Sequence, residues 1–378
     1  MRILITTPFF QFSGGSELET IHTANTFASL SKVEEVHVFV AGEFDLNFTK
    51  NIYIDRKIKF FTRPSFFNNI FFYKINKSIK RKLRLESLPF DFLYWRFKKL
   101  SRFDKIYIIT KTSLVNDYIP LIKLYGLKKD IVIKYTTVFF NPLENNTIKY
   151  LLQIRHNIVT SQKQKDFFVK NLDLKNTIAQ EILLFNESVA INKVRNQRKK
   201  GLYDFGILGR YSEEKQFEHA INLIADLRDK GFKARLIIKG GCDENYYKNL
   251  ENLVKEKKLE KLITISFEEV QYDEVYNFFD LFNCFLITSK YEGGPNVALE
   301  IMAYGLPILS YDVGAMKDRL NKFPELIAIN EEDLSKKAIE ILNYDESLFL
   351  QKCMDIKKTY IDDFSNDKKV AFLRDFLN

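Results

Sequence analysis

The sequence predicts an α/β protein made of two tandem, doubly wound domains, and three observations support this. The chain has 378 residues, more than a single hydrophobic core usually serves. Short apolar runs rich in β-branched residues alternate with segments of helical periodicity, which is the pattern of a parallel sheet covered by helices. A polar, basic stretch at 192–200 separates two such series and marks a domain boundary.

The first half begins with a strand at 2–7, a turn-rich loop from Pro8 to Gly15 and a helix at 16–30. Further short buried strands are predicted at 36–40, 105–109, 131–135 and 157–160. Ser16 and Glu19 have the spacing of a capping box at the start of the helix. The order of strand, glycine-rich loop and helix, followed by more strands, is Rossmann-like.

The second half repeats this alternation. Its strands are predicted at 203–208, 234–239, 262–267, 284–288 and 307–311, and its helices at 215–230, 245–257, 272–280 and 296–304. The last segment, from 333 to 378, is helical in pattern. We therefore predict an N-terminal domain at 1–190 and a C-terminal domain at 191–359, with a final helix at about 360–378 that packs back on the first domain.

Composition and cysteine usage exclude several classes of protein. With 46% hydrophobic and 28% charged residues, the chain is neither disordered nor fibrous. The three cysteines, Cys242, Cys284 and Cys353, lack the spacing of a disulfide framework or a zinc site, which favours a reducing, cytoplasmic compartment. No stretch approaches 18 apolar residues, and the apolar run at the N-terminus is too short for a secretory signal.

The positive charge of the chain is concentrated in its first half. Residues 1–190 carry 29 Lys and Arg against 17 Asp and Glu, a net charge of +12, whereas residues 191–378 carry 29 against 32, a net charge of −3. In the segment 60–105, aromatic and basic residues alternate with few acidic ones. This composition suits contact with an anionic membrane, where each Lys or Arg contributes about 1 kcal/mol.

A simpler interpretation of 60–105 is a helical insertion whose aromatic residues pack on the core and whose lysines are solvated. The sequence leaves both open. Nucleic acid is not expected as a partner, because no helix-turn-helix, zinc or RNP pattern accompanies the basic residues.

The strongest chemical pattern lies between a strand ending near Thr288 and a helix at 296–304. Gly293 and Gly294 let a phosphate approach the backbone, Pro295 suits a first helical turn, and Gly305 suits the end of the helix. The amide groups at the start of such a helix attract an anion.

Two carboxylates flank this predicted anion site. Glu292 precedes it and Glu300 follows it on the second turn of the helix, so that both can reach one ligand. Carboxylates in these places accept hydrogen bonds from sugar hydroxyls. The alternative is a local cap or salt bridge for Glu300 and a tight turn for the glycines.

A second element follows the first strand of the second half. It places Arg210 and Lys215 at the carboxyl ends of strands, where doubly wound sheets bind ligands, and two cations there would neutralise a diphosphate. The glycine-rich loop at 13–19 lacks the spacing G-x-G-x-x-G, which disfavours a nicotinamide cofactor. No D-x-D pattern occurs, so no metal is expected.

These elements together resemble the retaining, nucleotide-sugar-dependent glycosyltransferases of the GT-B architecture, in the family-four group. Two Rossmann-like domains face a central cleft in that architecture. The resemblance covers most of the chain and rests on an E-x7-E signature from Glu292 to Glu300, a Gly-Arg-x4-Lys element at 209–215 and the loop with Gly14 and Gly15, in the expected order.

The resemblance implies a role for each residue. Glu292, Arg210 and Lys215 would be the catalytic residues: Arg210 and Lys215 would grip the donor diphosphate, and Glu292 would contact the hydroxyls of the donor sugar. Glu300 would hold the nucleotide ribose, and Gly15, in the loop with Gly14, would let that loop close over the phosphates. The backbone at Gly293, Gly294, Pro295, Asn296 and Val297 would cradle sugar and phosphate.

The implied reaction transfers a hexose-type sugar from a UDP- or GDP-sugar to a lipid-linked acceptor or a growing surface polysaccharide. Retention in this family is thought to proceed by front-face attack, with the leaving phosphate helping to deprotonate the acceptor, so no side-chain nucleophile, cofactor or metal is required. Stabilisation of the departing diphosphate would supply most of the rate. The enzyme would act in the cytoplasm, or peripherally on the inner face of the cell membrane.

One residue departs from the family pattern. Many relatives have a histidine facing the donor sugar after a strand of the first domain, and this chain has Thr136 there. Two alternatives stay open: a nucleotide-sugar epimerase of similar fold, and a catalytically degenerate relative that binds glycan or serves as a scaffold in a glycosyltransferase complex. Both glutamates, Arg210 and Lys215 are present, which favours the enzyme.

Overall fold

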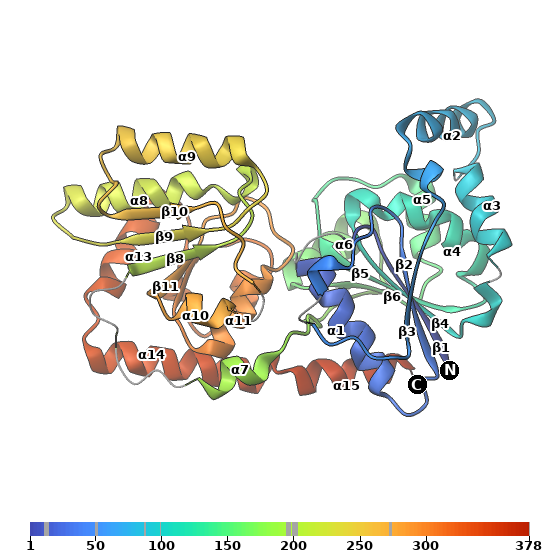
Figure 1. The fold of residues 1–378 in the computed structure, drawn as a ribbon. Coiled ribbons are helices and arrows are strands. Elements are labelled where there is room, and N and C mark those ends of the chain that lie inside the picture. The colour runs from blue at the N-terminus through green and yellow to red at the C-terminus, as the bar shows by residue number, and fades with distance from the viewer. Residues whose placement is uncertain are drawn as a thin grey trace. The chain divides into compact units, whose positions relative to one another are not determined.

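The computed structural model describes residues 1–10, 15–49, 52–86, 88–98, 100–193, 198, 203–271 and 274–377. These form two compact units. Unit 1 comprises Met1–Phe185 and Lys369–Asn378, and unit 2 comprises Asn186–Lys368. Each unit is a parallel sheet with helices on both faces (Figure 1). Gly14 and most of the stretch 192–200 lie outside the described residues.

Seven parallel strands form the sheet of unit 1, in the order β3-β2-β1-β4-β5-β6-β7. They are β1 (Arg2–Thr7), β2 (Glu35–Val40), β3 (Ile58–Thr62), β4 (Lys105–Lys111), β5 (Asp130–Thr137), β6 (His156–Val159) and β7 (Thr177–Ala179). In the register of the sheet, Ile5 of β1 lies opposite Val38 and Tyr107. The five strands predicted here are confirmed. The sequence analysis missed β3, whose residues are mostly half-exposed, and β7, which has three residues.

Helices cover both faces of this sheet. They are α1 (Gly15–Ser29), α2 (Ile70–Lys82), α3 (Pro89–Phe97), α4 (Ile119–Tyr125), α5 (Asn145–Leu151), α6 (Gln162–Leu172) and α15 (Asn366–Leu377), with the 3-10 turns η1 (Asn47–Thr49), η2 (Ser65–Asn68), η3 (Leu100–Arg102) and η4 (Thr112–Tyr118). On one face, Phe27 of α1 and Phe376 of α15 belong to a single core cluster. On the other face, Trp95, Ile122 and Phe168 of α3, α4 and α6 belong to a second cluster.

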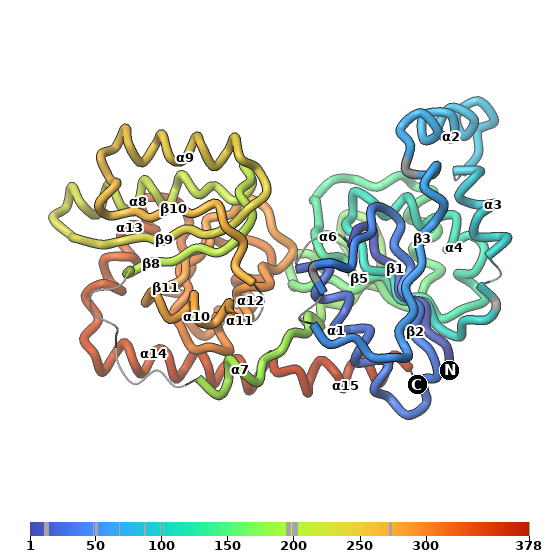
Figure 2. Tube along the Cα trace, viewed as in Figure 1, coloured from blue at the N-terminus to red at the C-terminus, as the bar shows by residue number. Residues whose placement is uncertain are grey.

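The terminal helix is fixed to unit 1 by polar contacts as well as by its apolar side chains. The Lys105 ammonium and the Arg155 guanidinium both donate to the carbonyl of Phe376, the latter at 3.0 Å. Both cations also pair with Asp130, at 2.8 and 2.9 Å. Figure 2 follows the chain through this helix to its end beside the first strands of the sheet.

The predicted capping box at Ser16 and Glu19 is wrong. The helix already begins at Gly15, so Ser16 lies inside it, and its hydroxyl donates to Glu17 at 2.8 Å. Glu19 is buried and pairs with the buried Lys134 of β5 at 2.7 Å. A buried ammonium needs an opposite charge, and this requirement determines the position of the glutamate.

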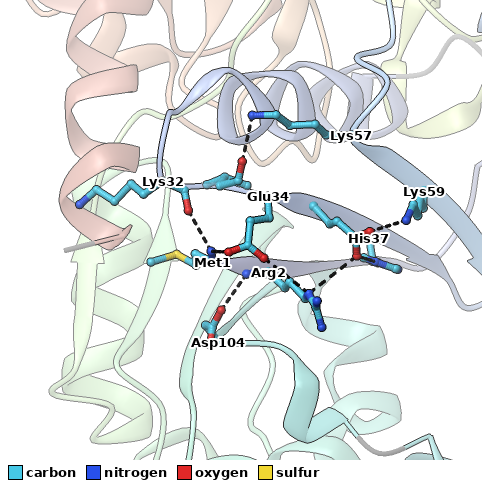
Figure 3. A network of polar contacts seen from close by, with 10 residues as sticks. Met1, Arg2, Lys32, Glu34, His37, Lys57, Lys59 and Asp104 are labelled. Carbon is cyan, nitrogen blue, oxygen red and sulfur yellow. Dashed lines mark hydrogen bonds and ion pairs between the residues drawn. The ribbon is translucent and has the colours of Figure 1, made fainter.

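A network of polar contacts closes the amino-terminal edge of this sheet (Figure 3). The N-terminal ammonium of Met1 donates to the Lys32 carbonyl at 2.9 Å and pairs with Glu34 at 3.1 Å. The amide of Arg2 donates to Asp104 at 2.7 Å, which ties β1 to the start of β4. Because ligands of doubly wound sheets bind at the opposite, carboxyl edge, this network has a structural role.

The sheet of unit 2 has six parallel strands in the order β10-β9-β8-β11-β12-β13. They are β8 (Tyr203–Leu208), β9 (Leu236–Lys239), β10 (Ile263–Ser266), β11 (Phe282–Ile287), β12 (Ile308–Tyr311) and β13 (Ile327–Ala328). In both units the first strand lies beside the fourth, and chain connections on the two sides run in opposite directions. This switch point is where doubly wound folds bind ligands, and in unit 2 it lies between β8 and β11.

The helices of unit 2 are α7 (Glu187–Asn192), α8 (Phe217–Asp229), α9 (Glu244–Glu256), α10 (Val275–Phe279), α11 (Asn296–Tyr304), α12 (Met316–Arg319), α13 (Glu331–Leu342) and α14 (Glu346–Thr359), with η5 (Glu213–Lys215), η6 (Pro324–Leu326) and the π-helical η7 (Tyr360–Phe364). Helix α8 packs with α9 and α13, whereas α11 packs with α7 and α14. None of the helices in the described parts of the chain has the length and apolarity needed to cross a membrane.

Candidate active site

The loops that follow β8 and β11 meet at the switch point of unit 2. The ammonium of Lys215 donates to Oε1 of Glu292, and Ser289 Oγ donates to the same oxygen at 2.9 Å. The hydroxyl of Thr288 donates to the Lys215 carbonyl at 2.8 Å. Lys215 and Glu292, which are 77 residues apart in the sequence, are therefore held together by the backbone and side chains of both loops.

The local structure around Lys215 differs from the prediction. The helix expected from residue 215 begins at Phe217, and Lys215 ends the short turn η5. Between them, Gln216 has a left-handed backbone with φ of 48°. This residue turns the chain between η5 and α8, so Lys215 lies in the loop and not on the helix.

The loop from Glu292 to Pro295 leads directly into α11. Pro295 is the residue before the helix, and not part of its first turn as predicted; it offers no side-chain cap. The first amides of a helix have no partners within the helix, so those of Asn296 and Val297 are available for an anion. Gly305, with φ of 85°, ends the helix as predicted.

Two residues that the sequence analysis missed contact the backbone of this loop. Arg319 is buried, and its guanidinium donates to the Pro295 carbonyl at 2.5 Å. Gly314 has φ of 56°, and a Cβ atom there would lie 2.6 Å from the Gly293 carbonyl oxygen. The loop from Glu292 to Pro295, here called the diglycine loop, thus packs against a third loop, the one after β12. The only signal in the sequence was a glycine soon after a predicted strand.

Glu300 lies on the second turn of α11, and no described residue shares a hydrogen bond or ion pair with it. Burial raises the pKa of its carboxyl group from 4.5 to about 7. A carboxylate held in a poorly solvated place without a cation gains from hydrogen-bond donors such as a pair of hydroxyls.

The raised pKa of Glu300 predicts how stability depends on pH. This pKa is higher in the folded than in the unfolded chain, so between pH 4.5 and 7 the carboxyl ionises more readily in the unfolded chain. The free energy of unfolding therefore falls by up to about 3 kcal/mol as the pH rises through this range. We expect Glu300→Gln to remove this loss and to raise the melting temperature at pH 8 but not at pH 4.5. Thermal unfolding across this range measures the effect, and equal pH profiles for both proteins would contradict it.

Among the described residues, Arg210 shares no hydrogen bond or ion pair with Lys215 or Glu292. Its side chain is exposed and lies 4.0 Å from Glu214, the residue before Lys215. Gly293 is buried in the loop, whereas Gly294, Asn296 and Val297 are half-exposed. A cavity of about 30 Å³, the share of one water molecule, is lined by Lys215, Glu292, Pro295 and Val297 among others.

Unit 1 contains three of the predicted site residues, Gly14, Gly15 and Thr136. Gly14 lies outside the described residues, and Gly15 begins α1. Thr136 lies near the end of β5, half-buried, with its hydroxyl donating to the Thr110 carbonyl at 3.2 Å. In the described parts of the chain, no group of three His, Cys, Asp or Glu is arranged to hold a metal ion.

Comparisons with known proteins show which sequences and structures the chain resembles. Residues 189–359 match the family described as glycosyl transferases group 1. An uncharacterized glycosyltransferase of Methanocaldococcus jannaschii is 25% identical over 357 residues, 92% of this chain and 90% of that protein.

Among solved structures, trehalose-6-phosphate synthase OtsA aligns with a TM-score of 0.73 at 12% identity, over 100% of this chain and 99% of its own. An E. coli structure bound with UDP-2-fluoro glucose gives the same values. WaaG, a glycosyltransferase involved in lipopolysaccharide biosynthesis, gives a TM-score of 0.65 at 13% identity, over 98% and 99% of the chains.

Two parallel sheets of this topology give the chain the GT-B fold of these solved glycosyltransferases. The match to the glycosyl transferases group 1 family, at residues 189–359, lies within unit 2. The fold and the family resemblance predicted from the sequence are thereby confirmed.

Proposed function

We propose that the chain is a retaining, metal-independent hexosyltransferase that uses a UDP- or GDP-sugar. The observation that carries the proposal is the arrangement at the β8 and β11 switch point. There, Glu292 lies beside the ammonium of Lys215 and immediately before the amino terminus of α11. A sugar diphosphate bound here would contact the Lys215 ammonium and the amino terminus of α11 through its phosphates. Its sugar hydroxyls would donate hydrogen bonds to the Glu292 carboxylate.

The chemistry assigned to this site needs no side-chain nucleophile. Lys215, Arg210 and the amides of Asn296 and Val297 would stabilise the departing diphosphate, whose oxygen would take the proton of the acceptor hydroxyl. Glu292 would orient the sugar through its hydroxyls, and Glu300 would accept hydrogen bonds from the ribose. The UDP-sugar analogue bound by an E. coli neighbour of the same fold supports a nucleotide-sugar donor.

We propose a lipid-linked or growing surface polysaccharide as the acceptor and a peripheral position on the cytoplasmic face of the membrane. The net charge of +12 in residues 1–190 supports an anionic acceptor at an anionic surface. The role of the neighbour WaaG in lipopolysaccharide biosynthesis agrees with this class of acceptor.

Thermal unfolding and calorimetry with UDP, GDP, ADP and their sugar conjugates, with and without Mg²⁺, test the donor. We expect saturable stabilisation by one nucleotide family without need for Mg²⁺. A strict requirement for Mg²⁺ would contradict metal independence. Absence of binding by every conjugate would favour the scaffolding alternative, to which the replacement of a histidine by Thr136 points.

A further inference from the structure

A region of unit 1, separate from the candidate active site in unit 2, has the features of a ligand site. It lies in the aromatic and basic segment 60–105. We call it the α2–α3 knob, residues 63–98, formed by η2, α2 and α3. Figure 1 shows α2 standing clear of the sheet. Along α2 the side chains are exposed or half-exposed except for Asn76, which is buried.

A buried polar anchor helps to attach α2 to the rest of unit 1. The amide of Asn76 donates to Asp91 of α3 at 2.7 Å and accepts from the Phe90 amide at 3.2 Å. Arg63 pairs with the other oxygen of Asp91 at 3.0 Å. The ring of Phe72 packs against Phe90, whereas Ile70, Phe71 and Tyr73 of the same helix are exposed and can contact another partner.

Side chains of η2 and α3, together with Phe72 of α2, line a groove of about 510 Å³, within the size range of small-molecule sites. Its walls are mainly aromatic: Phe66, Phe67, Phe72, Phe90, Tyr94 and Phe97. The rings of Phe66 and Phe67 stack at 4.7 Å, and those of Phe72 and Phe90 lie 5.1 Å apart. These ring contacts fix the positions of the aromatic side chains that line the groove.

The knob that carries the groove is rich in cations, and one of them, Lys98, lines the groove. Helix α2 carries Lys74, Lys77, Lys80, Arg81 and Lys82 and has no acidic residue. Lys98 of the lining lies over the ring of Tyr94 at 5.5 Å. On the same knob Ile70, Phe71 and Phe97 are 72%, 70% and 77% exposed. An apolar groove on a positively charged knob complements a molecule with a hydrocarbon chain and an anionic head group.

We propose that the groove binds one hydrocarbon chain of an anionic phospholipid in a bilayer, with the cations of α2 at the level of the phosphates. The aromatic residues of the segment then divide into two groups. Trp95 is buried in the core against Phe39 at 4.7 Å, while Phe66, Phe71 and Phe97 face the lipid. The proposal refines the membrane contact of the proposed function, but lipid binding is measurable without any donor.

The single tryptophan of the chain reports occupancy of the groove. The ring of Trp95 lies 5.2 Å from that of Tyr94, which lines the groove. We expect vesicles of phosphatidylcholine and phosphatidylglycerol in equal parts, with brominated chains, to quench its fluorescence. Brominated vesicles of phosphatidylcholine alone are expected to leave it unchanged, and equal quenching by both would overturn the requirement for an anionic lipid.

Variants test the contributions of the groove and of the charged surface to lipid binding separately. Leu93→Glu with Phe97→Glu places carboxylates in the groove at side chains 45% and 77% exposed. Leu127→Glu with Leu152→Glu is the matched control in the same unit, at 83% and 47%. We expect about a tenfold or greater loss of vesicle binding and loss of quenching in the groove variant only.

Two further outcomes decide the proposal. Replacing Lys74, Lys77, Arg81 and Lys82 by serine is expected to reduce binding, whereas the same change at Lys128, Lys163, Lys170 and Lys175 is not. Loss of binding in the charge variant but not in the groove variant would overturn the hydrocarbon site. Lys215→Ala is expected to bind vesicles like the wild type, so failure of the transferase assignment is measured separately from failure of the lipid site.

Discussion

Lys215→Ala is expected to lower donor turnover by about 10²–10³-fold, since preorganised groups that face developing charge contribute on this scale. The substitution removes the cation nearest Glu292 and one of the two hydrogen bonds to Oε1 of that carboxylate. The effect should include weaker binding of the nucleoside diphosphate. Release of the nucleoside diphosphate from the nucleotide sugar measures turnover, and calorimetry measures the affinity.

Lys230→Ala is the matched control for this prediction. Lys230 belongs to the same unit, just after α8, and pairs with Asp226, but it lies away from the β8 and β11 loops. Glu292→Gln, which keeps the shape of the side chain, is expected to lose turnover while retaining most of the affinity for the diphosphate. Wild-type turnover in Lys215→Ala would contradict the site.

Gly314→Ala is expected to destabilise unit 2 by about 2 kcal/mol or more and to abolish donor binding. The φ of 56° strains any residue with a Cβ atom, and the new atom would lie 2.6 Å from the Gly293 carbonyl oxygen. Relief of that contact must displace the loop that carries Glu292 and leads into α11. Thermal unfolding and donor titration measure the two effects.

Gly231→Ala provides a control in which only the backbone strain is present. Gly231 also has a positive φ, of 87°, yet a Cβ atom there would meet nothing within 4 Å. Its loss of stability should be about 1 kcal/mol, with donor affinity unchanged. Equal donor affinities in the two variants would show that Gly314 does not support the diglycine loop.

The fold could be predicted because its signals are local. Buried parallel strands such as 106–109 and 284–287 are continuous apolar runs, which a sequence displays directly. The errors occurred where a tertiary contact decided the outcome. Glu19 had the spacing of a cap but serves as the partner of the buried Lys134, 115 residues away. The left-handed Gln216 could not be expected from a residue type that rarely adopts this conformation.

The candidate site could be predicted in part for the same reason. The E-x7-E pattern lies within nine consecutive residues, so its loop and helix are visible in the sequence. That Lys215 contacts Glu292 depends on the pairing of β8 with β11, which spacing alone does not reveal. Arg319 and Gly314 were missed because they act on the backbone of the loop from another loop, without any recognisable chemistry of their own.

The assignment of Lys369–Asn378 to unit 1 makes unit 2 an insertion within unit 1. Leu373, Phe376 and Leu377 belong to the same core cluster as Ile3 and Ile5 of the first strand. During synthesis, all of unit 2 is therefore translated before the cover of one face of the first sheet, begun by α1, can be completed by α15. Although chains generally fold from the N-terminal side, here unit 2 can complete its core first, while the apolar face of unit 1 awaits its final helix.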